Sequence, residues 1–132
     1  MDFADLRRRA EWLVEHKAKP TLQDQGHYDP VVFVFGDHGF LNAVNLSLEG
    51  DRPIREEVLE AVEFSGGTAF VFVRDARHPE RGEALLVALE HPQGRVLWYT
   101  PFARGDRIAL QPTQVFEGEG AGGPWAEALW RS

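Results

Sequence analysis

The sequence contains no cysteine, which excludes disulfide bonds, thiolate metal sites and cysteine nucleophiles. Serine is scarce as well: the chain has only three, and none lies in the Gly-x-Ser-x-Gly pattern of a serine nucleophile. No apolar stretch is long enough to cross a membrane, and the N-terminal residues lack the apolar run of a signal peptide. The sequence therefore predicts a cytoplasmic protein with no membrane partner.

Basic residues are outnumbered: 14 lysines and arginines stand against 21 aspartates and glutamates, for a formal net charge of −7. The single basic cluster is the run of arginines at 7–9, which fits the solvated face of a helix. Nucleic-acid backbones reward clustered lysine and arginine, so we expect no nucleic-acid partner. The acidity leaves open a chaperone-like or inhibitory role toward a basic protein. Arginine outnumbers lysine by twelve to two, a bias typical of GC-rich bacterial genomes.

Length and composition fit one globular domain. The chain has 132 residues, of which 43% are hydrophobic and 27% are charged, as in ordinary soluble proteins. A chain of this size buries about two-thirds of the surface that it exposes when unfolded, so its core needs no disulfide or metal. We therefore assign residues 1–132 to a single domain.

Four stretches are apolar at nearly every position, and each has the length of a strand. They cover residues 31–35, 69–73, 84–89 and 96–99. Neighbouring residues of a strand point to opposite faces of the sheet, so a continuously apolar strand is usually covered on both faces. Because the chain offers only three helical segments as cover, part of the sheet is expected to line a pocket or to meet a partner. We expect a homodimer.

Apolar residues at helical spacing predict three helices. The first covers residues 3–17 and is stopped by Pro20. The second opens after a cap at Asp51. A flexible link at 118–123 leads to a last helical turn or two at 124–130.

Six strands are predicted, and turn-like connections between the last four indicate an antiparallel meander. The second strand alternates apolar and polar residues, which places it at a sheet edge. Pro112 in the last strand implies a bulge or an edge position, because proline cannot donate to a ladder. The fold class is therefore α+β: a mainly antiparallel sheet of five to six strands, element order α-ββ-α-ββββ-α, and helices mostly on one face. The predicted strands are 31–35, 40–48, 68–74, 83–90, 95–101 and 107–116.

Histidines are the residues on which a catalytic or metal site would depend. His38 follows Asp37 in a predicted turn, whereas His78 and His91 flank the predicted strand 83–90 at its two ends. His38 can form a cluster only with whichever of these two shares its end of the sheet. The chain has no HxH or HExxH pattern, so we assign no metal and no cofactor. A small metal-dependent or hydrolytic enzyme that uses these histidines and carboxylates is the alternative function.

Aromatic side chains are the other candidates for a functional role. Trp12 lies opposite the apolar stripe of the first helix and is expected to be exposed. The others lie on a predicted strand or on the last helix, where they either pack in the chain's own core or cross a subunit boundary. The interface candidates are Trp12, Trp98, Tyr99, Phe102, Trp125 and Trp130.

No motif in the chain identifies a known family, and no catalytic motif is present. The sequence therefore favours a non-enzymatic binding or protein-interaction module that is cytoplasmic and homodimeric. Another protein or a small molecule would be its ligand.

Overall fold

The computed structural model describes residues 1–48, 50–118 and 125–131. No helix within these ranges is long and apolar enough to cross a membrane. The helical elements are α1 (Phe3–Leu13), the π-helical turn η1 (Val14–Ala18), α2 (Lys19–Gln25), α3 (Ile54–Phe64) and α4 (Trp125–Leu129). The strands are β1 (Val31–Gly36), β2 (Gly39–Asn45), β3 (Ala69–His78), β4 (Gly82–His91), β5 (Gly94–Ala103), β6 (Ala109–Leu110) and β7 (Gln114–Glu117).

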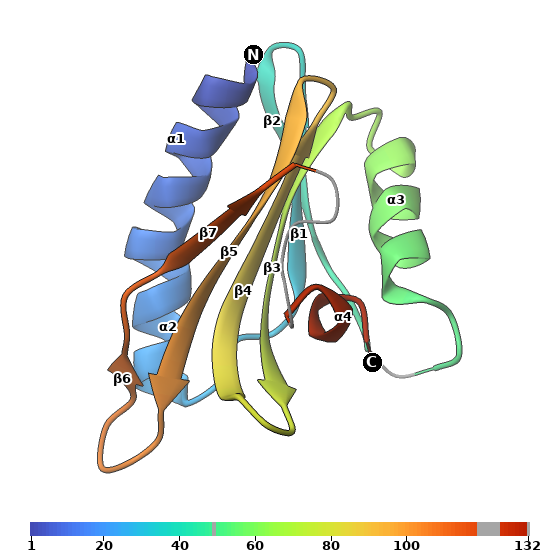
Figure 1. The fold of residues 1–132 in the computed structure, drawn as a ribbon. Helices are drawn as coiled ribbons and strands as arrows, with labels where there is room; N and C mark the ends of the chain where they lie inside the picture. The colour runs from blue at the N-terminus through green and yellow to red at the C-terminus, as the bar shows by residue number, and fades with distance from the viewer. Residues whose placement is uncertain (49, 119–124, 132) are drawn as a thin grey trace.

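The strands of the described residues form one antiparallel sheet with the order β2-β1-β3-β4-β5-β6, and β7 also pairs with β5 (Figure 1). The α+β class and the order helix, two strands, helix, strands are as predicted. β2 lies at a sheet edge, as its alternating residues indicated. At the other edge, Pro112 falls between β6 and β7. The predicted strand 107–116 is therefore two short strands, each paired with β5.

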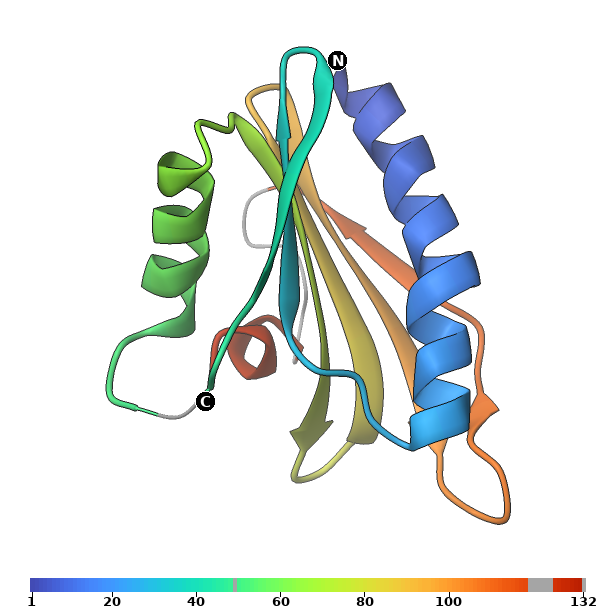
Figure 2. The same cartoon turned by 180° about the vertical axis from the view of Figure 1, so that it is seen from behind.

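The sheet separates two apolar cores. Side chains alternate along each strand, so Val31 and Phe35 of β1 belong to one core and Val32 and Val34 to the other. The helix running from α1 to α2 covers the first face, whereas α3 and α4 cover the second (Figures 1 and 2). The helices thus lie on both faces and not mostly on one, because the sheet is apolar on both. Together they cover the apolar faces that we expected to line a pocket or to meet a partner.

The N-terminal helix does not stop at Pro20 but continues to Gln25 and ends at Gly26, whose φ of 80° suits glycine. The cause is the π-helical turn η1, in which the Lys19 N–H donates to the carbonyl of Val14, five residues back. Pro20 then stands in the first turn of α2. A proline is tolerated there, because its missing N–H would have no partner in the first turn.

The spacing of the buried residues explains why η1 is needed. Leu6, Ala10, Val14, Ala18 and Leu22 recur at every fourth position and face the same core. Four residues of an α-helix overshoot one turn by about 40°, so such a stripe would gradually wind off the sheet. The extra residue in η1 resets the stripe, and Leu22 is as fully buried as Leu6.

The remaining differences from the prediction concern element ends. α3 begins after Pro53 with no side-chain cap, so Asp51 does not cap it. By contrast, α1 has a reciprocal cap between Asp2 and Asp5. The predicted link at 118–123 lies outside the described residues from position 119 onward.

Candidate interaction surface

The aromatic interface candidates lie mainly in the chain's own cores. Four are at most 7% exposed, namely Trp98, Tyr99, Phe102 and Trp125. Trp130 is partly buried and stacks on Phe72 of β3, with ring centroids 5.6 Å apart. Trp12 differs, because 53% of it is exposed. Of these six residues, Trp12 is therefore the one with the most surface exposed to solvent.

The candidate catalytic residues are divided between the two ends of the sheet. Asp37 and His38 form the turn between β1 and β2, and His91 ends β4 at the same end. His78 ends β3 at the opposite end. Within the described residues, no group of three or more histidine and carboxylate side chains could hold a metal ion. The four candidates therefore do not meet in one site.

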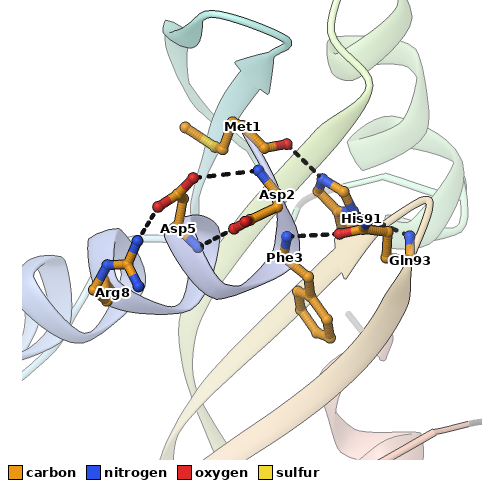
Figure 3. Close-up of polar contacts among 7 residues, drawn as sticks. All are labelled: Met1, Asp2, Phe3, Asp5, Arg8, His91 and Gln93. Atoms are coloured by element: carbon orange, nitrogen blue, oxygen red, sulfur yellow. Dashed lines mark hydrogen bonds and ion pairs between the residues drawn. The ribbon is translucent and has the colours of Figure 1, made fainter.

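His91 links the start of α1 to the turn between β4 and β5 (Figure 3). Its Nδ1 accepts the Gln93 N–H at 3.0 Å, so Nε2 carries the proton and donates to the Met1 carbonyl at 3.1 Å. The ring also stacks on Phe3, with centroids 5.9 Å apart, and the Phe3 N–H donates to the side chain of Gln93 at 2.9 Å. One ring nitrogen thus holds the start of the helix, and the other holds the turn.

His78 is used in a similar turn. Its Nδ1 accepts the Glu80 N–H at 3.1 Å, as His91 does two residues before Gln93. The ring of His78 then meets Trp125 of α4 edge-on, with centroids 5.7 Å apart. The two His-Pro segments therefore share a turn geometry that accounts for their likeness in sequence.

Most of the exposed large apolar side chains in the described residues lie on β2 or on the helices at either side of it, and four of them lie on β2 or line the hollows beside it. Within the described part of the chain, five of the six large apolar side chains that are exposed lie on β2, α1 or α3. Figure 2 shows β2 between these two helices. The five are Trp12, Phe40, Leu41, Leu59 and Phe64, and Phe64 is 88% exposed. The sixth, Val115, lies on β7.

The edge strand itself carries no charged residue from Gly39 to Asn45. The Leu46 N–H donates to the Pro30 carbonyl at 3.0 Å, so by alternation Ala43 and Asn45 direct their backbone groups away from β1. Edge strands are commonly blocked by charges or proline, and β2 has neither. The opposite edge is made of the short strands β6 and β7. β2 is therefore the edge open to further pairing.

An aromatic groove opens beside β2 on the face covered by α1. Its volume is about 410 Å³, and its walls are Arg9, Trp12, Leu13, Phe33, Phe35 and Phe40. The rings of Phe35 and Phe40 meet edge-on at 5.8 Å. The guanidinium of Arg9 lies close to Gly39. A Cβ atom added to Gly39 would be 3.8 Å from Nη2 of Arg9.

A second hollow lies beside β2 on the other face, between β2 and α3. Its volume is about 500 Å³, and its apolar wall includes Val44, Leu46 and Phe64. At its rim, Arg52 donates to Glu60 at 2.5 Å, and this hydrogen bond lowers the pKa of Glu60 below its ordinary value. Both faces of β2 are thus flanked by hollows with apolar walls.

A buried arginine fastens the C-terminal helix. Arg74 of β3 is 7% exposed, and its Nη1 donates to the carbonyls of Leu129 at 3.2 Å and Arg131 at 2.5 Å. Burial lowers the pKa of Arg74 from its usual value, although the nearby charge of Asp75 acts in the opposite direction. A cation is favourable at the carbonyl end of a helix, so Arg74 positions α4 on the sheet.

Comparisons with protein-family models, curated proteins and solved structures found no match for this chain. Its function must therefore be inferred from its own surface.

Sequence reasoning identified Trp12 but missed Phe40, Leu41 and Phe64. Two signals in the sequence point to them. The edge strand from Gly39 to Asn45 has no charge to prevent pairing, and Phe64 lies off the apolar stripe of its helix.

Proposed function

We propose that the protein is a homodimeric protein-interaction module whose two copies pair along the free edge of β2. The observation that carries this proposal is an uncharged edge strand with four exposed large apolar side chains on it or in the walls of the hollows beside it, namely Trp12, Phe40, Leu41 and Phe64. Exposed apolar patches of this kind mark interaction sites. A cytoplasmic location belongs to the same proposal.

Antiparallel pairing joins the two sheets into one. Ala43 of one copy faces Asn45 of the second copy. The backbone groups of these two residues, which point away from β1, then form hydrogen bonds with each other across the interface. The two-fold axis then lies perpendicular to the sheet and keeps the α1 helices of both copies on one face. The exposed rings of Trp12 and Phe40 come close to the subunit boundary in this arrangement.

The neutrality of β2 favours a second copy as the partner. In a two-fold interface each residue near the axis meets an equivalent of itself or of its neighbour, so any charge would face a like charge. Residues 39–45 contain no charge, and this repulsion does not arise even though the whole chain carries −7.

Ala43→Lys tests the proposal. Residue 43 is exposed on β2, and a lysine there introduces the charge that natural edge strands use to prevent pairing. In size exclusion with light scattering over a dilution series, we expect a dimer for the unmodified chain and a monomer for the variant. Thermal unfolding should show that the variant remains folded.

The matched control is Val115→Lys, which introduces a lysine at an exposed apolar residue of the opposite edge. This control should remain dimeric. A monomer at every concentration for the unmodified chain, or a dimer that survives Ala43→Lys, would overturn the assignment of β2 as the interface.

A further inference from the structure

The aromatic groove beside α1 has the form of a small-ligand site. Its volume of about 410 Å³ falls in the lower part of the range for ligand pockets. Four of its six lining residues are aromatic, and Arg9 is the only charged one. Sites of this kind hold an apolar body against the rings and orient it through a small number of polar groups.

Two further basic side chains of the N-terminal helix lie beside this groove, on the ring of Trp12. Lys17 lies over the ring of Trp12, with its Nζ 5.8 Å from the ring centroid, and His16 packs on the same ring at 5.0 Å. Arg9 lines the groove itself, so two basic side chains, Arg9 and Lys17, lie at or beside it on a chain whose net charge is −7. Among the residues that the structure describes, neither Arg9 nor Lys17 has an ion-pair partner.

Two acidic residues of the same helix lie on its other flank. Glu11 and Glu15 line a hollow that also contains Trp98 and Val115, on the side of β5 and β7. Glu15 is neutralised by an ion pair with Lys19. The cations without an ion-pair partner, Arg9 and Lys17, therefore lie at or beside the aromatic groove, whereas Glu11 and Glu15 lie on the other flank of the helix.

We infer that the groove binds a small anionic ligand with an apolar body, such as an aryl or alkyl carboxylate or sulfonate. The body lies against Phe33, Phe35 and Phe40, and the anionic group meets the guanidinium of Arg9 at the mouth. Arginine suits this role, because its planar fork recognises carboxylates and related anions.

This site does not depend on the proposed dimer. The groove lies on the face covered by α1, whereas the two copies pair in the plane of the sheet through the backbone of β2. The side chains of a neighbouring strand would extend the wall formed by Phe40. A monomeric chain therefore keeps the groove, and the two proposals can fail separately.

A matched pair of fluorescent probes separates the two halves of the inference. The probe 8-anilinonaphthalene-1-sulfonate has the anionic group, whereas N-phenyl-1-naphthylamine has the same aromatic body without it. Both should bind at one site per chain, and the anionic probe should bind more tightly. Octanoate should displace the anionic probe, since alkyl carboxylates belong to the proposed class.

Variants then assign each contact. Arg9→Gln should lower the binding affinity for the sulfonate probe by about tenfold, which is the loss expected for one charge-assisted hydrogen bond. The affinity for the neutral probe should not change. Phe40→Ala should weaken both probes. Arg107→Gln, an exposed arginine of the loop between β5 and β6, is the control and should change neither.

The inference is overturned if neither probe binds, or if Arg9→Gln affects the two probes equally. Binding of several probes per chain that Phe40→Ala leaves unchanged overturns it as well, because it shows adsorption elsewhere. Light scattering of the same samples reports the dimer independently, so loss of the dimer with retained probe binding contradicts only the interface proposal.

Discussion

At the scale of single residues, Arg74 shows how one buried cation can determine the position of a whole element. It follows the apolar run 69–73 of β3, and among the described residues its guanidinium donates to carbonyl groups and forms no ion pair. Desolvating a guanidinium is costly, so these hydrogen bonds must offset that cost. The sequence alone did not single out Arg74, because the carbonyls that bind it come from the other end of the chain.

Arg74→Met should loosen α4. Methionine keeps the length and apolar stem of arginine but leaves the carbonyls of Leu129 and Arg131 without their donor. We expect the free energy of unfolding to fall by about 1–3 kcal/mol and amide hydrogen exchange to accelerate in residues 125–131. The exposed Arg77→Met is the control and should change neither quantity. A more stable protein with slow exchange in α4 would show that the buried charge is a net cost.

At the scale of elements, local patterns predicted the strands well and the first helix poorly. β3, β4 and β5 are apolar at consecutive positions, and short apolar runs of this kind are typical of strands that are covered on both faces. Pro20 was a local signal that failed, because the helix end is decided by the packing of Leu22 against a sheet made from distant residues. The open edge was predictable from β2, whereas the groove was not, since it requires knowing which helix flank faces Phe40.

The role of η1 can be tested by removing its extra residue. Deletion of Lys17 turns the helix into a regular α-helix, in which Ala18 and Leu22 follow Val14 at normal spacing and stay on the core side. Combined with Pro20→Ala, the deletion should change the free energy of unfolding by less than about 1 kcal/mol. The deletion alone should cost about 3 kcal/mol, because Pro20 then lies inside a regular helix.

Denaturant unfolding of both variants decides the matter. If the deletion alone and the deletion combined with Pro20→Ala lower the free energy of unfolding equally, η1 serves a purpose other than accommodating the apolar stripe and the proline. Lys17→Ala, which changes the side chain but not the spacing, should resemble the unmodified chain.

At the scale of the whole molecule, the sheet acts as a wall between two separate cores, and the charged surface surrounds both. Each copy carries −7, so two copies repel each other at long range, while the proposed contact through β2 is neutral. Added salt should therefore strengthen dimerisation, as the Debye length shortens from about 30 Å at 0.01 M to about 10 Å at 0.1 M.

Sedimentation equilibrium at the two ionic strengths measures this effect. We expect the dissociation constant to fall several-fold at the higher ionic strength. A dissociation constant that rises with salt would indicate an interface held by ion pairs, which β2 cannot supply.

The position of the N-terminal helix has a consequence for how the chain acquires its structure. The apolar stripe of α1 packs on β3, β4 and β5, which are completed only when residue 103 has been synthesised. The helix therefore leaves the ribosome well before the strands that cover it are complete. Contacts between residues so distant in sequence delay folding, because long loops must close before they form. A nascent chain ending within β4 would carry this helix uncovered, and it is at this stage that the protein most needs protection from aggregation.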